Sequence, residues 1–257
     1  MNHIVVVTDV TDRVLCIEIN RPEKKNALTQ AMYQAMADAL RAADADPAVR
    51  AVLIRGKADL FTSGNDLKDF LDNPPRDQDR PVFQFLHAIS HAQKPVVAAV
   101  AGAAVGIGTT MLLHCDLVYA APNARFQLPF VNLGLVPEAA SSLLLPALAG
   151  YQRAAELLLL GEPFTAERAL EIGLVNAIVP EDRLIDTAMA QAKKLAQKPA
   201  GALRLAKQLM KQGQLAAVEQ QMKLEAVHFA ERLGSPEAKE AFSAFLEKRK
   251  PDFSKFG

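Results

Sequence analysis

A single glutamate, Glu138, is the strongest candidate for chemistry in this sequence. It lies in the run 131–141, where apolar residues surround it and Gly134 precedes it. A carboxyl group among hydrocarbon neighbours has a raised pKa, because burial disfavours its charged form, and it becomes a better proton acceptor near neutral pH. The same position also suits a glutamate that opens a helix and is favoured there by the helix dipole. The sequence therefore predicts either a general base or a helix-start residue.

Three other groupings are weaker candidates. Residues 106–111 begin like a dinucleotide-binding fingerprint but lack its third glycine or alanine. His87 and His91 are four residues apart, but no glutamate follows His87 as it does in zinc peptidases, so we interpret them as a structural pair and expect no metal site. The run His114-Cys115-Asp116 has no serine elbow beside it and is interpreted as a structural helix end.

Composition and charge argue against several classes of function. The 257 residues carry 29 basic and 29 acidic side chains, so we expect no nucleic-acid or membrane partner. The two cysteines, Cys16 and Cys115, are far apart and typical of reduced thiols in a cytosolic protein. The start of the chain, 1–4, lacks the basic and apolar regions of a signal peptide. We therefore expect a cytoplasmic location.

One uncharged segment, 95–113, has the length of a membrane span. It opens with a short β-branched run and contains Gly102, Gly106 and Gly108. Glycines at this spacing interrupt a spanning helix. We therefore predict a buried strand, a glycine turn and a buried helix.

The elements that must position these residues alternate between strand and helix. Strands are expected at 4–8, 14–19, 49–54, 95–100, 117–120 and 175–179. Helices are expected at 29–45, 81–92, 165–172, 182–197, 199–212, 214–232 and from Pro236 onward, with Thr29 and Ser235 as N-caps. The polar stretch 72–80 is expected to be a loop that gates a site. This order predicts an α/β core over 1–197 followed by a helical region over 198–257.

Motifs along nearly the whole chain resemble those of the crotonase (enoyl-CoA hydratase/isomerase) superfamily. They are found at 20–28, 61–67, 94–102, 164–175 and 245–250. Within the superfamily, Ser63–Leu67, Val105–Ile107 and Pro137-Glu138 most resemble the peroxisomal-type Δ3,Δ2-enoyl-CoA isomerases. The resemblance implies a spiral of repeated ββα turns with a C-terminal helical trimerisation region. It also implies a homotrimer or a dimer of trimers.

The resemblance further implies an oxyanion hole that holds a thioester carbonyl. Its donors are expected to be the backbone N–H groups of Asn65 and Ile107. Gly64 and Gly106 permit the sharp turns and close approach that such donors need, although isolated glycines most often mark ordinary turns. Each donor aimed at a developing enolate oxygen typically supplies about 3–4 kcal/mol.

The same resemblance implies an acyl-CoA thioester substrate, so that CoA arrives with the substrate and no separate cofactor is expected. Contacts with the substrate are expected from Arg21, Lys24, Lys25, Ala27, Ser63, Asp66, Leu67, Phe130 and Lys248. Lysines and arginines are usually solvated surface charges, and Asp66 also suits the N-cap of a helix. Phe130, Leu133 and Leu135 are expected along the acyl tail, although apolar residues are more often simply core.

Two departures from the hydratase pattern limit which reactions the protein is expected to catalyse. The hydratases of the superfamily use two glutamates, and the matching positions here hold Thr110 and Phe130. Hydration needs a group that deprotonates water and an acid that protonates carbon, and neither residue can do this. Moving a double bond needs only one base, and Glu138 matches the position of the isomerases' single catalytic glutamate.

We therefore expect an isomerase that shifts the double bond of 3-enoyl-CoA to 2-trans-enoyl-CoA by proton transfer through an enolate. A second hypothesis is another crotonase-type enzyme, such as an enoyl-CoA hydratase in which Glu138 serves alone. A third is a non-catalytic scaffold that binds acyl-CoA.

Overall fold

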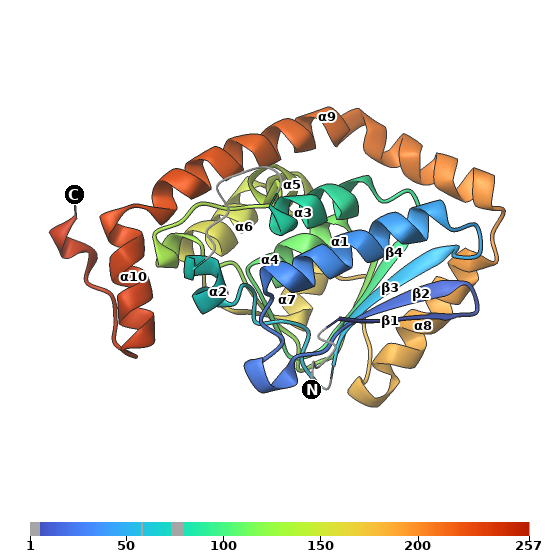
Figure 1. Cartoon of the computed structure of the whole chain (residues 1–257), viewed down its shortest axis with the longest axis horizontal. Helices are drawn as coiled ribbons and strands as arrows, with labels where there is room; N and C mark the ends of the chain where they lie inside the picture. The colour runs from blue at the N-terminus through green and yellow to red at the C-terminus, as the bar shows by residue number, and fades with distance from the viewer. Residues whose placement is uncertain (1–5, 58, 73–79, 257) are drawn as a thin grey trace.

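A computed structural model describes residues 6–57, 59–72 and 80–256 of the chain. Two sheets form its centre, and helices cover them (Figure 1). The strands in the described part are β1 (Val6–Thr11), β2 (Val14–Ile19), β3 (Ala51–Gly56), β4 (Val96–Val100), β5 (Ala103–Val105), β6 (Leu117–Ala120), β7 (Arg125–Gln127), β8 (Phe164–Thr165) and β9 (Ala177–Ile178).

The helices are α1 (Gln30–Ala45), α2 (Leu67–Asp72), α3 (Pro81–His91), α4 (Ile107–Thr110), α5 (Ser141–Ala149), α6 (Tyr151–Ala155), α7 (Ala166–Glu171), α8 (Leu184–Ala196), α9 (Ala200–Leu233) and α10 (Pro236–Leu246). Short 3₁₀ turns cover Pro22–Lys24, Met111–His114, Val131–Leu133, Glu181–Arg183 and Phe253–Lys255, and a π-helical turn covers Glu156–Leu160.

The main sheet has six strands in the order β1-β2-β3-β4-β6-β9, and the second sheet has the order β5-β7-β8. The predicted hairpin is confirmed: β1 and β2 are antiparallel, with Val6 opposite Ile19 and Thr11 opposite Val14. Asp12 and Arg13 form its turn at φ angles of 51° and 65°. The first two residues of the expected strand 4–8 lie outside the described residues. The other neighbours in the main sheet run parallel.

Each face of the main sheet is buried by different helices. On one face, Val52 and Ile54 of β3 join the large apolar cluster that contains residues of α1 and α3. On the other face, Ala51 and Leu53 pack in the cluster that contains the small residues of α8. Because both faces are covered, the strand is apolar from Ala51 to Ile54 instead of alternating with polar residues.

The C-terminal half departs from the sequence prediction at one point. The two helices expected at 199–212 and 214–232 are a single helix, α9, of 34 residues, and Gly213 lies inside it. A glycine within a helix costs only about 1 kcal/mol relative to alanine. Burial of Lys207, Val218 and Phe229 along one side holds the helix together across that position. Figure 1 shows α9 crossing the whole width of the molecule, with α10 at its far end.

Two helices start at the predicted capping residues, Thr29 and Ser235, and Thr165, expected as the first residue of a helix, is instead the N-cap of α7. The side-chain oxygens of Thr29, Thr165 and Ser235 accept hydrogen bonds from the backbone N–H groups three residues later. Such caps satisfy donors that the helix itself leaves unpaired. The last expected strand is shorter than predicted, with only Ala177–Ile178 paired.

The uncharged segment 95–113 contains the predicted strand, β4, and the predicted helix is the short α4 followed by a 3₁₀ turn. A second strand, β5, lies where only a glycine turn was expected. In the described part of the chain, no helix combines the length and apolar composition needed to cross a membrane. The expected gating loop lies mostly at 73–79, outside the described residues.

Candidate active site

A pocket of about 620 Å³ gathers segments that are far apart in the sequence. They are the loop after β2, the chain that leads into α2 and α4, the turns around residue 130, and α9 and α10. Its lining residues include Lys24, Lys25, Ala27, Ser63, Asn65, Asp66, Leu67, Ile107, Phe130, Leu133, Leu135, Glu138, Phe242 and Phe245. A cleft of this size with a mostly apolar wall and few polar groups is typical of a small-molecule site.

The two predicted oxyanion donors lie on neighbouring segments. The backbone N–H of Thr62 donates to Ala103 O (2.9 Å), and that of Val105 donates to Thr62 O (3.1 Å). Gly64 follows at φ 89°, and a Cβ there would come within 2.8 Å of Val105 O. The close approach therefore requires glycine.

The N–H groups of Asn65 and Ile107 are available to a ligand. Among the hydrogen bonds of the described residues, neither group donates to a protein acceptor. Ile107 is the first residue of α4, and a helix leaves its first N–H groups without partners inside the helix. Buried backbone N–H groups are rarely left unpaired, so two such groups at one pocket indicate a binding site for an oxygen atom.

Glu138 is not a helix-start residue, which corrects one of the two interpretations of its position. Helix α5 begins three residues later, at Ser141, and the intervening Ala139 and Ala140 have φ angles of 62° and 56°. This left-handed backbone turns the chain away from helical geometry before α5 starts. Stabilisation by the helix dipole therefore does not explain the carboxylate.

The surroundings of Glu138 favour its neutral form. Its Oε1 atom is buried and has no hydrogen-bond partner in the described structure, although the residue as a whole keeps some solvent contact. Burial, and secondarily the charge of Glu225, raise the pKa of Glu138 to about 8. A carboxyl group with such a pKa can both take and return a proton near neutral pH.

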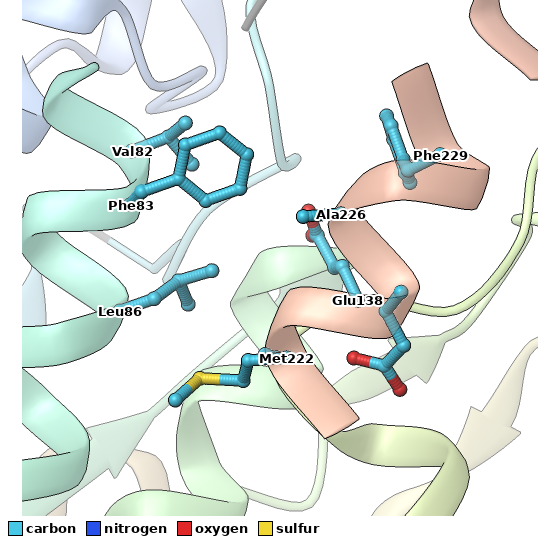
Figure 2. A pocket seen from close by; sticks show the side chains of 9 residues that line it. Val82, Phe83, Leu86, Glu138, Met222, Ala226 and Phe229 are labelled. Atoms are coloured by element: carbon cyan, nitrogen blue, oxygen red, sulfur yellow. The ribbon is translucent and has the colours of Figure 1, made fainter. Parts of the chain in front are cut away.

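Glu138 also lines a second, small space of about 20 Å³ between α3 and α9. Figure 2 shows Val82, Phe83 and Leu86 of α3 across from Met222, Ala226 and Phe229 of α9. The space holds about one water molecule. The carboxyl group thus lies between the main pocket and an apolar crevice.

Several of the residues that were expected to contact the substrate line the main pocket. Lys24 and Lys25 line it and are exposed, and Ala27, Ser63 and Leu67 line it as well. The proposed acyl-tail residues Phe130, Leu133 and Leu135 line it too.

Arg21 and Lys248 are not among the described residues that line this pocket. Arg21 instead forms an ion pair with Asp66 (Nη1 to Oδ2, 2.6 Å) and donates to Ala27 O. Asp66 lines the pocket, but its Oδ1 accepts from the N–H groups of Lys68 and Asp69 at the start of α2. Both residues of this pair therefore have structural partners.

The two positions that replace the hydratase glutamates differ in their surroundings. Phe130 lines the pocket, whereas Thr110 is fully buried in α4 and is not among the described lining residues. Thr110 Oγ1 is buried without a hydrogen-bond partner in the described structure. Neither side chain carries a group that titrates near neutral pH.

The histidine pair, one of the weaker candidates, contacts other protein side chains. The rings of His87 and His91 stack with centroids 4.0 Å apart, and His91 Nε2 lies 2.6 Å from Glu219 Oε1. Cys16 and Cys115 are free thiols. Across the described residues, no three His, Cys, Asp or Glu side chains group as metal ligands would.

Residues 114–116 end a 3₁₀ turn, as interpreted. Asp116 Oδ2 accepts from Val96 N and from Lys207 Nζ, both at 2.7 Å. His114 is buried, and its Nε2 lies 2.8 Å from Ala139 O. The histidine thus contacts the residue next to Glu138.

Sequence reasoning missed three contributors to the site. Tyr33 of α1 donates a hydrogen bond to the side chain of Asn65, Glu225 of α9 bonds to the turn after Glu138, and Phe245 of α10 covers the pocket. One signal for Glu225 was present. It shares helical spacing with Val218 and Phe229, so the pattern places a carboxylate on the buried face of α9.

Comparisons with known proteins identify the family of this chain. The sequence model of a family described as "Enoyl-CoA hydratase/isomerase" matches residues 9–255. Over 244 residues the chain is 35% identical to the 2,3-dehydroadipyl-CoA hydratase of Escherichia coli (strain K12), covering 94% of this chain and 95% of the relative. Over 213 residues it is 36% identical to the enoyl-CoA delta isomerase 2 of Homo sapiens, covering 80% of this chain and 54% of the relative.

The fold is also that of a solved relative. A crystal structure of an enoyl-CoA hydratase/isomerase from Pseudoalteromonas atlantica T6c superposes with a TM-score of 0.94 at 44% identity, covering 97% of this chain and 100% of that chain. The expected α/β fold of the crotonase type is confirmed. The chain belongs to the enoyl-CoA hydratase/isomerase family.

Proposed function

We propose that this enzyme converts 3-enoyl-CoA to 2-trans-enoyl-CoA, with Glu138 as the sole proton carrier. One observation supports the proposal above the others. Of the described residues that line the main pocket, the carboxylates are Asp66 and Glu138. Asp66 is engaged by Arg21 and by the start of α2, so Glu138 is the carboxylate that is available to a substrate.

The proposed reaction needs one base and one pair of oxyanion donors. Glu138 takes a proton from C2 of the 3-enoyl thioester, and the electron pair moves onto the thioester oxygen. The N–H groups of Asn65 and Ile107 hold this oxygen as an enolate. The protonated Glu138 then donates to C4 as the electrons return, which leaves the double bond between C2 and C3. Atoms and electrons balance without an added cofactor, and CoA remains part of the substrate.

The main alternative is hydration, because the relatives include a hydratase as well as an isomerase. Hydration requires a base that activates water and an acid for the α-carbon at the same time. The matching positions, Thr110 and Phe130, offer no second carboxylate. A scaffold that only binds acyl-CoA is disfavoured by the raised pKa of Glu138 beside two unpaired N–H groups.

An assay with two substrates tests these alternatives. The purified enzyme is incubated separately with 3-hexenoyl-CoA and 2-hexenoyl-CoA, and the products are separated chromatographically. Interconversion of the two esters supports the isomerase. Formation of 3-hydroxyhexanoyl-CoA from 2-hexenoyl-CoA as the main product supports a hydratase instead, and binding without turnover supports the scaffold.

The setting of this activity is also part of the proposal. We propose a cytoplasmic homotrimer or dimer of trimers. The free thiols of Cys16 and Cys115 are consistent with a reducing compartment. Exposed apolar side chains on α9 supply a surface for assembly.

A further inference from the structure

The turn that carries Glu138 is attached to α9 by a second buried glutamate. Glu225 is 5% exposed. Its Oε2 accepts from the N–H of Ala140 at 2.6 Å. Its Oε1 accepts from the N–H of Ser142 at 3.1 Å and from Ser142 Oγ at 2.5 Å. One carboxylate thus binds three donors within four residues of the proposed base.

Two further contacts hold the same turn. Gln221, one helical turn before Glu225, donates from Nε2 to Ser142 Oγ at 2.8 Å. His114 lies 2.8 Å from Ala139 O. Burial lowers the pKa of His114 to about 4, so the ring is neutral at physiological pH and donates its Nε2–H to the carbonyl.

The backbone of this turn needs such support. Ala139 and Ala140 both have positive φ angles, a conformation that is unfavourable for a residue with a Cβ atom. Surrounding contacts must therefore maintain it. The contacts from α9 and His114 fix the backbone on the C-terminal side of Glu138.

We propose that Glu225 is the positioning residue for Glu138: the Glu225 carboxylate holds the 139–142 turn so that Glu138 faces the main pocket, and the negative charge of Glu225 keeps Glu138 a strong base. The inference rests on the proposed function, in which Glu138 carries the proton. Glu225 is not among the described residues that line the main pocket, so it acts through the turn and not on the substrate.

The electrostatic part of the proposal follows from the unequal surroundings of the two carboxylates. Three donated hydrogen bonds stabilise the charge of Glu225, whereas Glu138 Oε1 has no partner in the described structure. Glu225 therefore ionises first, even though burial raises its pKa. A charged Glu225 then opposes ionisation of Glu138 and makes it a stronger base.

Other groups around Glu138 do not cancel this effect. Tyr33 of α1 faces it as a neutral phenol, because burial raises the pKa of Tyr33 well above its usual value. His114 is neutral, as above. Arg232 of α9 bonds to Gly134 O and pairs with Glu237 of α10. The facing side of α3, formed by Val82, Phe83 and Leu86, is apolar (Figure 2).

Two substitutions separate the geometric role from the electrostatic one. Glu225→Gln keeps an acceptor for Ala140 N but removes the charge. We expect the protonation midpoint of Glu138 to fall by about one pH unit. The weaker base should lower the high-pH plateau of kcat/KM several-fold, while the rate at pH 6 stays equal or rises because more Glu138 is ionised. Glu225→Ala removes the anchor, and kcat should fall at least tenfold with KM changed less than threefold.

Glu219→Gln is the matched control on the same helix. Glu219 pairs with His91 at 2.6 Å and is not among the described residues that line either pocket at Glu138. This variant should leave both the midpoint and the rates unchanged. A uniform loss of rate at every pH in Glu225→Gln would indicate a merely structural glutamate and overturn the proposal.

A second readout does not depend on turnover. The carboxyl infrared band of Glu138 can be identified as the band lost in Glu138→Gln and titrated in the free enzyme. An unchanged midpoint in Glu225→Gln would refute the inference even if the enzyme isomerises 3-enoyl-CoA. A lowered midpoint in an enzyme that fails to isomerise it would support the Glu225–Glu138 coupling and refute the proposed function.

Discussion

The phenol of Tyr33 donates a hydrogen bond to Oδ1 of Asn65, a residue that lines the main pocket. Tyr33 is fully buried in α1 and packs against Phe85 of α3, with ring centroids 5.7 Å apart. Asn65 itself sits on an irregular segment between Gly64 and α2. The bond therefore ties a proposed oxyanion donor to the rigid helical layer.

Tyr33→Phe should weaken catalysis without preventing folding. The substitution keeps the ring packing but removes the hydrogen bond to the side chain of Asn65. The backbone N–H of Asn65 is then held less accurately against the enolate oxygen. We expect kcat to fall about tenfold, less than the 10²–10³-fold loss typical of removing an oxyanion donor. Steady-state kinetics check this expectation. The control is Tyr119→Phe, because Tyr119 is a buried tyrosine on the opposite face of the sheet. Equal kinetics in the two variants would contradict the role.

Glu138→Gln should abolish most of the proposed isomerase activity. The change preserves volume but removes the base, and losing a general base typically costs about 10²–10⁴-fold in rate. Because one residue both takes and returns the proton, the loss should lie at the upper end. Thr110→Ala and Phe130→Ala should cost much less. If Glu138→Gln keeps more than a tenth of the wild-type rate while Thr110→Ala abolishes it, the base must be another residue.

The same substitution should stabilise the protein at high pH. The pKa of Glu138 is about 8 in the folded state and 4.5 when unperturbed, so between these values the folded state holds the extra proton and stability falls as pH rises. At pH 9, Glu138→Gln should exceed wild type by roughly 2–5 kcal/mol. At pH 4 the two should be equal. Urea unfolding at fixed protein concentration measures this, with the exposed Glu162→Gln as a control.

Lys24 and Lys25 should contribute to CoA binding through their charge. Both are exposed at the pocket, and phosphates attract lysines as point charges. The double change Lys24→Glu and Lys25→Glu should raise KM about 3–30-fold at low salt and much less at 1 M salt, because salt screens exposed charges. Lys194→Glu on α8, remote from this pocket, should leave KM unchanged. A KM increase that persists at high salt would argue against phosphate contacts.

The protein should be a trimer or a dimer of trimers in solution. Leu205, Leu209 and Met210 on α9 are 54%, 61% and 76% exposed, and exposed apolar side chains that gather in a patch mark protein–protein interaction sites. Leu209→Glu with Met210→Glu should dissociate the assembly, while Gln208→Glu on the same helix should not. Light scattering at micromolar concentration distinguishes these outcomes, and a stable wild-type monomer would refute the prediction.

The apolar residues of α9 divide into two groups in the structure. Phe229 is 8% exposed and joins the core, and Met222 packs partly against it. The exposed group is instead formed by residues such as Leu205 and Leu209. Helical spacing alone could not separate them, since it gives the faces of a helix but not which face meets the core.

Local chemistry alone determined much of the fold. The caps Thr29 and Ser235, the hairpin of β1 and β2, and the strand–turn–helix at 95–113 depend on interactions between residues close in sequence. The candidate base Glu138 was also identifiable, because a carboxylate in an apolar run is unusual in any fold.

Only the tertiary structure decided what each candidate contacts. Arg21 is paired with Asp66, Gly213 lies inside one continuous helix, and Glu138 precedes α5 on a left-handed turn. Each outcome depends on partners distant in sequence, above all Glu225, 87 residues after Glu138 in this chain. Burial sets the pKa of Glu138, and burial is produced by the packing of α3 and α9, which no local pattern specifies.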